Sequence, residues 1–151
     1  MSSSTRLAVA THVLAALALA SGRAVSSELV ARSVSTNPAF VRRLLASLAR
    51  AGLTTSQLGK GGGALLARSA DEITLLDVHR AVDEPLLLGL HHGGPNLACP
   101  LGKNILPILE AELATATSAF EQSLAKTTIA DVARRITSRA GKAAIDRLLG
   151  I

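Results

Sequence analysis

The 151-residue chain contains no tryptophan, no tyrosine and only two phenylalanines, Phe40 and Phe120. A core must therefore come from leucine, valine, isoleucine and alanine, a composition that favours packed helices. The single cysteine, Cys99, excludes an intramolecular disulfide, so nothing in the sequence indicates an oxidising compartment. Hydrophobic residues make up 48% of the chain, which suits one folded domain and argues against intrinsic disorder.

Acidic side chains are almost absent from the first half of the chain. Residues 1–70 contain eight lysines and arginines and one acid, Glu28, for a net charge of +7, whereas residues 71–151 carry −2. A basic half of this kind indicates an anionic partner, most often nucleic acid, with anionic lipid as the competitor. Beyond the opening run, no apolar stretch approaches the ~20 residues that a bilayer-spanning helix needs.

The opening run, RLAVATHVLAALALASG at residues 6–22, has two interpretations. A basic start, an apolar stretch and the small-x-small ending Ala18-Leu-Ala20 are typical of a secretory signal peptide. The spacing of its apolar residues instead indicates an amphipathic helix that ends at Gly22. We favour the helix, because His12 interrupts the apolar run and the segments that follow would otherwise lack apolar cover. We therefore expect a cytoplasmic protein.

Two short helices and a turn precede a third helix that carries arginines. The second helix and its turn are expected at residues 26–36, and the third helix at 37–51, where Asn37-Pro38 provides an N-cap and a first helical position. Residues 53–67 are expected to form a β-hairpin around the glycine-rich basic segment 59–63. This order predicts a mainly α fold with a small β-hairpin wing, the winged helix-turn-helix.

The third helix of such a fold can enter the major groove of DNA, while the wing approaches phosphates. Seven residues are then expected to contact DNA: Ser35, Thr36, Asn37, Arg42, Arg43, Gln57 and Lys60. Solvated arginines also occur on helices that bind no DNA. Two alternatives therefore stay open: a winged-helix module that binds a protein through the same face, and a small secreted helical protein.

The second half of the chain predicts a short helix at 75–82, capped by Thr74, and a longer helix at about 104–126. The apolar residues of the longer helix recur at steps of three and four, as in a coiled-coil seam: Leu106, Leu109, Leu113, Ala116, Phe120 and Leu124. A helix of this length has little else to cover it, so we expect dimerisation through this seam. A last helical stretch begins at Thr128 or Asp131, with an interruption at Gly141.

Three segments and one tripeptide resemble a known family. The segments are NPAFVRRLLASLARAGL at 37–53, GKGGGALLAR at 59–68 and ITLLDV at 73–78, and the tripeptide is Cys99-Pro-Leu101. Together they resemble the bacterial repressors of the IscR, NsrR and CymR type, the Rrf2 family, over about residues 5–133. The family's wing usually reads Gly-Gly-Tyr, whereas this chain has alanine in the third place.

The resemblance implies a cytoplasmic, homodimeric transcription regulator that binds double-stranded DNA at a palindromic operator. Residues 1–82 would form the DNA-binding domain, and residues 83–151 a sensor-like loop, the dimerisation helix and a C-terminal helix. A two-fold dimer presents two recognition helices to half-sites about 34 Å apart. No membrane partner is expected, and no grouping of catalytic residues indicates an enzyme.

Cluster-binding members of the family hold an iron–sulfur cluster with three cysteines before the long helix. Only the last of these has a match, Cys99, and one thiolate cannot supply the mostly cysteine ligands of such a cluster. We therefore expect no iron–sulfur cluster and no other cofactor. His91 and His92 match no recognised metal-ligand spacing, so no metal site is expected either. Cys99 stays open as an oxidant sensor or a packing residue.

Overall fold

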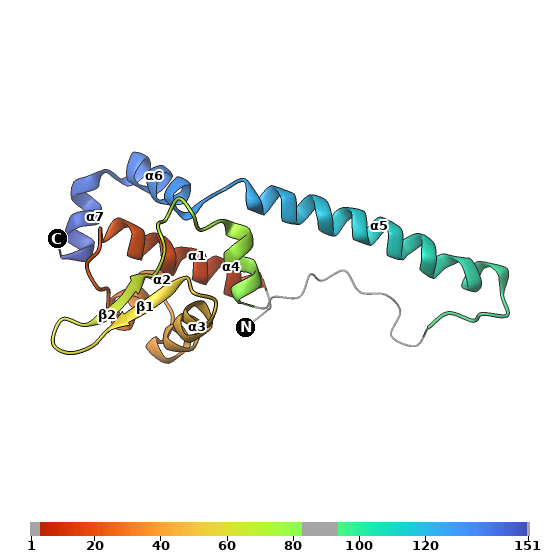
Figure 1. The fold of residues 1–151 in the computed structure, drawn as a ribbon, viewed down its shortest axis with the longest axis horizontal. Coiled ribbons are helices and arrows are strands. Elements are labelled where there is room, and N and C mark those ends of the chain that lie inside the picture. The colour runs from red at the N-terminus through yellow and green to blue at the C-terminus, as the bar shows by residue number, and fades with distance from the viewer. Residues whose placement is uncertain (1–3, 83–93, 151) are drawn as a thin grey trace.

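The computed structural model describes residues 4–82 and 94–150. Seven helices and a two-stranded hairpin follow one another in this part of the chain (Figure 1), in the order α1 (Ser4–Leu19), α2 (Ser27–Val34), α3 (Pro38–Arg50), β1 (Thr54–Gln57), β2 (Gly63–Leu66), α4 (Leu75–Ala81), α5 (Pro100–Ala125), α6 (Ile129–Ala140) and α7 (Lys142–Leu149). The expected fold class, mainly helical with a hairpin wing, is confirmed.

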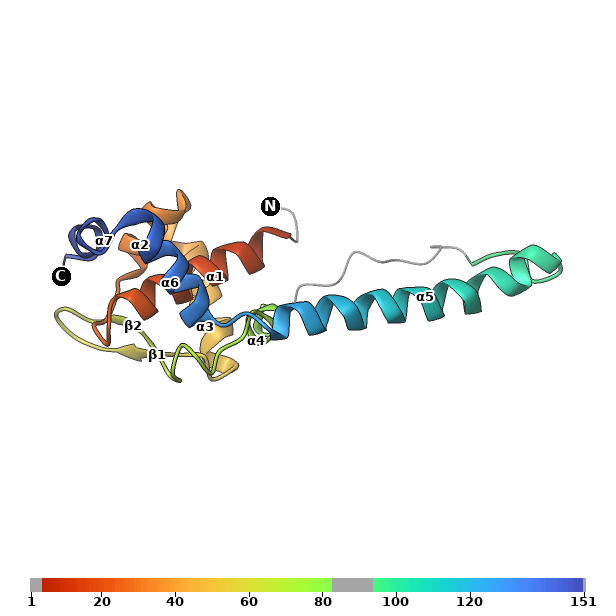
Figure 2. The same cartoon turned by 90° about the horizontal axis from the view of Figure 1, so that it is seen from above.

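The central element is α1, which packs against α2, α3, α4, β2 and α6 (Figures 1 and 2). Ala10, Val13 and Leu14 on this helix are completely buried. The opening run of the sequence is therefore a core helix of the folded domain, as expected. Ile129 at the start of α6 belongs to the same core. Residues on both sides of position 82, the expected domain boundary, therefore contribute to one hydrophobic core.

The helix-turn-helix is formed by α2 and α3, each with a side-chain N-cap. The Ser26 hydroxyl caps α2, and the Asn37 side chain caps α3 by accepting a backbone N–H at 2.8 Å. Between the helices, Ser35 adopts the left-handed conformation, with φ 57° and ψ 46°, and the Thr36 N–H donates to the Ala31 carbonyl at 2.9 Å. These contacts turn the chain sharply and fix where α3 begins.

The wing is an antiparallel hairpin in which Thr54 lies opposite Leu66. Val25, just before α2, extends it by one backbone bridge: its N–H donates to the Ala64 carbonyl at 3.0 Å, and its carbonyl accepts the Ala64 N–H at 2.9 Å. Gly63 permits this approach, because a Cβ there would lie 2.4 Å from the Val25 carbonyl oxygen. The wing is therefore joined to the start of the helix-turn-helix.

Helix α5 projects from the rest of the molecule as a single arm (Figures 1 and 2). It contains 26 residues, which corresponds to a length of about 39 Å. The helix begins at Pro100, so the predicted start near Asn104 is wrong. Pro107 consequently lies inside the helix and not in its first turn. The reason is local: Pro100 is itself suited to the first helical position.

The base of the arm is joined by backbone hydrogen bonds to the segment that follows the wing. The Leu75 N–H donates to the Thr127 carbonyl at 2.9 Å, and the Ile129 N–H donates to the Ile73 carbonyl at 2.8 Å. The segment just before α4 and the segment just after α5 thus lie side by side, joined by an antiparallel bridge between Thr74 and Thr128.

Helices α6 and α7 return the chain to α1. Thr128 caps α6 in a reciprocal capping box with Asp131, so the helix begins at the first of the two positions that the sequence allowed. Gly141, with φ 80°, separates α6 from α7, which confirms the expected interruption. Within residues 4–82 and 94–150, no helix combines the length and the apolar character needed to cross a bilayer.

Candidate nucleic-acid interface

The outer face of α3 carries exposed basic side chains. The opposite face is buried through Val41, Leu44 and Leu48, so Arg42 and Arg43 point away from the core. The Arg43 guanidinium lies over the half-buried Phe40 ring, 6.0 Å from its centroid. A helix with one face in the core and cations on the other is suited to enter a groove of DNA.

Arg42 is held against the first turn of α2. Its Nη2 lies 3.3 Å from Oε1 of Glu28, and its Nε donates to the Ser27 hydroxyl at 3.3 Å. The pKa of Glu28 lies below its usual range because the carboxylate accepts hydrogen bonds from its own N–H and from Ser27, with the charge of Arg42 adding to this. Since these side chains are exposed, the ion pair orients Arg42 and adds little stability.

A groove of about 340 Å³ lies between α3 and the hairpin. Arg42 from the helix and Gln57 from β1 both line it, so the structure brings together two residues predicted from separate segments. Thr55 and Ser56, which the sequence interpretation left out, line the same groove and are exposed. The sequence could have indicated both residues, because all four residues of the strand Thr54–Gln57 are polar. In the structure only Thr54 of this strand is buried.

Ser35, Thr36 and Asn37 meet at the N-terminal end of α3. Ser35 and Asn37 are exposed, whereas Thr36 is half-buried. The Asn37 Oδ1 already accepts the Phe40 N–H, so the side-chain NH₂ is the part that remains for a base or phosphate. The three residues thus lie where a recognition helix meets base edges.

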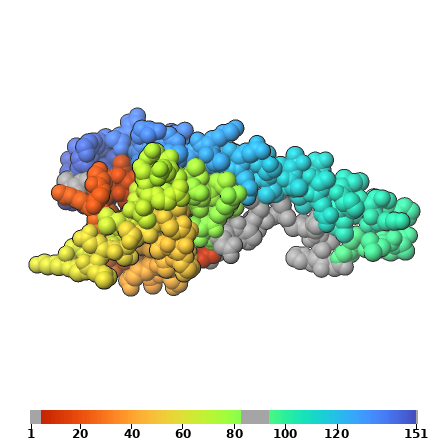
Figure 3. Space-filling model, in the orientation of Figure 1, coloured from red at the N-terminus to blue at the C-terminus, as the bar shows by residue number. Residues whose placement is uncertain are grey.

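The tip of the wing protrudes from the body of the molecule (Figure 3). Lys60 lies there, exposed, between Gly59 at φ 90° and Gly61 at φ 77°, two conformations that side-chain-bearing residues rarely adopt. Gly62 closes the turn, since a Cβ at this position would lie 2.3 Å from the Gln57 carbonyl oxygen. The glycines therefore set the shape of the tip and place one cation at its end.

The six residues predicted for dimerisation lie along α5: Leu106, Leu109, Leu113, Ala116, Phe120 and Leu124. Only Gly102 is buried among the residues of this helix. Phe120 contacts His79 of the same chain in a T-shaped arrangement with ring centroids 5.3 Å apart, and Arg80 pairs with Glu121 at 3.1 Å. The base of α5 thus packs on α4, while Ile108, 59% exposed, adds to the accessible apolar surface farther along.

Cys99 is the N-cap residue of α5 and is exposed. The nearby backbone N–H groups of Gly102 and Leu101, in the first turn of α5, hold the pKa of the thiol below its ordinary value. Gly102 is needed in this turn, because a Cβ there would lie 2.2 Å from the Asn96 carbonyl oxygen. The thiol is therefore accessible, and its reactive, ionised form is stabilised relative to that of an ordinary cysteine.

The residues present do not fit an iron–sulfur cluster. Cys99 is the sole cysteine of the sequence, and it lies at a helix start with no other thiolate to complete a cluster. In the two stretches that the structure describes, no group of three histidine, cysteine, aspartate or glutamate side chains is placed to hold a metal ion. His91 and His92 lie outside the described residues.

Comparison with known proteins agrees with this geometry. A family model, Rrf2, described as an iron-dependent transcriptional regulator, matches residues 3–135. YwnA of Bacillus subtilis, described as an HTH-type transcriptional regulator, is 40% identical over 128 residues, which is 85% of this chain and 94% of YwnA.

Two solved structures show the same architecture. A crystal structure of a protein described as DNA-binding is 37% identical, with a TM-score of 0.67 over 84% of this chain and 97% of that chain. CymR, titled the global cysteine regulator of B. subtilis, is 23% identical, with a TM-score of 0.63 over 89% of this chain and 96% of CymR, and shows the fold alone. With its recognition helix, its wing and a family match over most of its length, the chain belongs to the Rrf2 family of DNA-binding winged-helix transcriptional regulators.

Proposed function

We propose that the protein is a homodimeric, sequence-specific repressor that binds a palindromic operator. The observation that carries this proposal is the continuous surface formed by the N-terminal end and outer face of α3, the groove beside it and the wing tip. Residues 1–82 bind DNA, and residues 83–151 provide dimerisation and sensing. Since the target is chromosomal DNA, the protein acts in the cytoplasm of a bacterium.

Within this surface, the side chains divide by task. Ser35, Thr36, Asn37 and Arg42 lie at the end of α3 that meets base edges, and arginine can bond to guanine through two donors at once. Arg43 and Lys60 contact phosphates on either side of the groove. Gln57 reaches the same duplex from β1. Base contacts fix the sequence that is bound, whereas phosphate contacts fix position and supply most of the salt-dependent affinity.

The dimer forms through α5. Its apolar residues are accessible along an arm that projects from the domain, and a second copy of the same helix would cover them. Leu109→Lys should therefore yield a monomer by light scattering at micromolar concentration. Ala111→Lys, which adds the same charge at an exposed position on the side of the helix away from the predicted seam, should remain a dimer. A monomeric parent protein would contradict this part of the proposal.

Cys99 gives the repressor a redox response. Its thiolate attacks a peroxide oxygen; the O–O bond breaks, the sulfur becomes a sulfenic acid and the peroxide is reduced to water. Oxidation at the start of α5 would weaken operator binding. Mass spectrometry of peroxide-treated protein should show one added oxygen on Cys99. A Cys99→Ser variant should keep its affinity for the operator after the same peroxide treatment. If peroxide released DNA equally from the variant and from the parent protein, Cys99 would not be the sensor.

Selection of bound sequences from random duplexes tests the central claim. The expected result is an enriched palindrome whose half-sites lie one helical turn apart. Arg43→Ala should lower affinity for that duplex, whereas Arg139→Ala, an exposed arginine on α6, serves as the matched control and should change it little. Selection without enrichment would favour the alternative, a winged-helix module that binds a protein. An enriched single half-site would contradict the two-fold dimer.

A further inference from the structure

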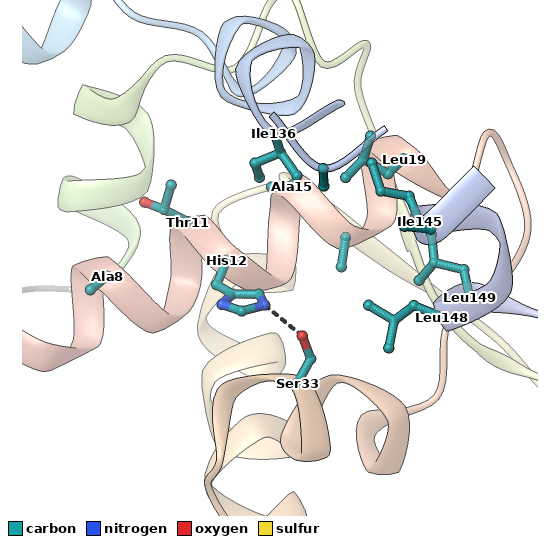
Figure 4. Close-up of a pocket in the computed structure, with 13 residues that line it drawn as sticks. Ala8, Thr11, His12, Ala15, Leu19, Ser33, Ile136, Ile145, Leu148 and Leu149 are labelled. Carbon is teal, nitrogen blue, oxygen red and sulfur yellow. Dashed lines mark hydrogen bonds between the residues drawn. The ribbon is translucent and has the colours of Figure 1, made fainter. Parts of the chain in front are cut away.

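A second concave surface lies between α1, α6 and α7, apart from the proposed DNA-binding face (Figure 4). The groove has a volume of about 570 Å³, within the ~300–1,000 Å³ typical of small-molecule sites. Its apolar walls come from all three helices, chiefly Ala15, Leu19, Ile136, Ile145 and Leu148. None of these residues takes part in the contacts proposed for DNA.

Apolar side chains in this groove stay accessible to solvent. Leu148 is 55% exposed and Ile136 is 37% exposed, although Ala15 and Ile145 beside them are buried. Exposed apolar residues gathered in a concavity differ from leucines scattered singly over a surface, because a ligand can bury several of them at once. The groove therefore offers apolar contact area that the described fold leaves unused.

One end of the groove is polar. His12 Nε2 lies 2.8 Å from the Ser33 hydroxyl, and Thr11 lies beside them (Figure 4). Burial lowers the pKa of His12, so its ring is mostly neutral at physiological pH. Among the described residues that line the groove there is no lysine, arginine, aspartate or glutamate. A charged ligand would lose hydration here without gaining a counter-charge, whereas a neutral hydroxyl or carbonyl could join the His12–Ser33 pair.

The size of the groove favours a small molecule over a helix from a protein partner. One turn of an α-helix is 5.4 Å long and about 10–12 Å across, so it occupies about 500 Å³ with its side chains. The groove therefore accommodates about one turn. Helix-in-groove binding uses anchors at i, i+3, i+4 and i+7, which extend over two turns.

We propose that this groove binds a neutral small molecule with an apolar body and one hydrogen-bonding group, which bonds to the His12–Ser33 pair. The family match ends at residue 135, before Ile136 and the whole of α7. One wall of the groove thus lies beyond the segment that this chain shares with the family model. The proposal is independent of DNA recognition, because binding can be measured without DNA.

Equilibrium dialysis of the full chain with 4-ethylphenol tests this proposal. The protein has no tryptophan or tyrosine, so the near-ultraviolet absorbance of the probe can be followed with little interference. We expect saturable binding of one molecule per chain. Ethylbenzene, which lacks the hydroxyl, should bind about 2- to 10-fold more weakly, the usual net effect of one hydrogen bond. The anion 4-ethylbenzoate should bind more weakly than 4-ethylphenol.

Variants locate the site. Ala144→Leu fills the groove from α7, and Ala140→Leu fills it from α6; each should weaken 4-ethylphenol binding at least tenfold. Ala143→Leu is the matched control on α7, since Ala143 is exposed and does not line the groove, and binding should not change. Ser33→Ala should remove the preference for 4-ethylphenol over ethylbenzene. Circular dichroism confirms that each variant is folded.

Three results would overturn the proposal. These are equal affinity of the parent protein for all three probes, undiminished binding by both groove-filling variants, and absence of saturable binding. If the last result were accompanied by a changed oligomeric state in Ala144→Leu, the groove would instead be a contact between protein chains.

Discussion

Replacing Lys60 by alanine should reduce the salt dependence of operator binding by a calculable amount. The side chain lies exposed at the wing tip and forms no ion pair with any residue that the structure describes. Each phosphate contact adds about 0.9 to the slope of log affinity against log salt, and a dimer loses two contacts, so the slope should become less negative by about 1.8. A fourfold rise in salt should then weaken the variant about 12-fold less than the parent.

Fluorescence anisotropy with a labelled operator duplex, titrated at several salt concentrations, measures this slope. Lys126→Ala removes the same charge from an exposed position at the end of α5 and should leave the slope unchanged. An equal change in the two variants would mean that net charge, and not a wing contact, sets the salt dependence. An unchanged slope for Lys60→Ala would show that the wing tip does not approach phosphate.

Three further outcomes follow from contacts in the interface and at α5. Glu28→Gln removes the carboxylate that lies 3.3 Å from the Arg42 guanidinium and repels DNA, so anisotropy titrations should show a higher affinity for duplexes of any sequence. An unchanged affinity would show that the ion pair persists on DNA. Asn37→Ala leaves the Phe40 N–H without its cap, and urea unfolding should show a loss of about 1 kcal/mol. Because the Cys99 pKa is lowered, its thiolate forms at lower pH, and its alkylation by iodoacetamide should accelerate at lower pH than that of free cysteine.

The recognition helix and the wing could be predicted because their signals are local. An N-cap followed by proline fixes the start of α3 within the sequence itself, and Asn37 and Pro38 occupy the predicted positions. The glycines at 59–63 likewise mark the hairpin turn, whose strands form on either side of it. In each case the deciding interaction joins residues that are close neighbours in the chain, so no knowledge of the tertiary fold was needed.

The contacts that orient the site could not be predicted in the same way. The Arg42–Glu28 pair joins residues 14 positions apart and depends on how α2 crosses α3. The groove between α1, α6 and α7 forms only because α6 and α7, which follow the 26-residue α5 in the sequence, pack back against the first helix of the chain. The start of α5 was misplaced because Pro100 and Pro107 are both acceptable in a first helical turn, and sequence spacing alone does not choose between them.

Helix α5 also has the proportions of a lever, because it is long and projects from the body of the molecule at one end. Its base is joined through Thr127 and Ile129 to the strand-like segment behind the wing, and its far end lies about 39 Å away. A rotation of about 5° at the base moves the far end by about 3.4 Å, the rise of one base pair along a DNA strand. In the proposed dimer the same geometry runs in reverse. A displacement of about 3.4 Å between the far ends of the paired arms corresponds to a rotation of only about 5° at their bases, so contact between the arms would hold the orientation of the two recognition helices within narrow limits.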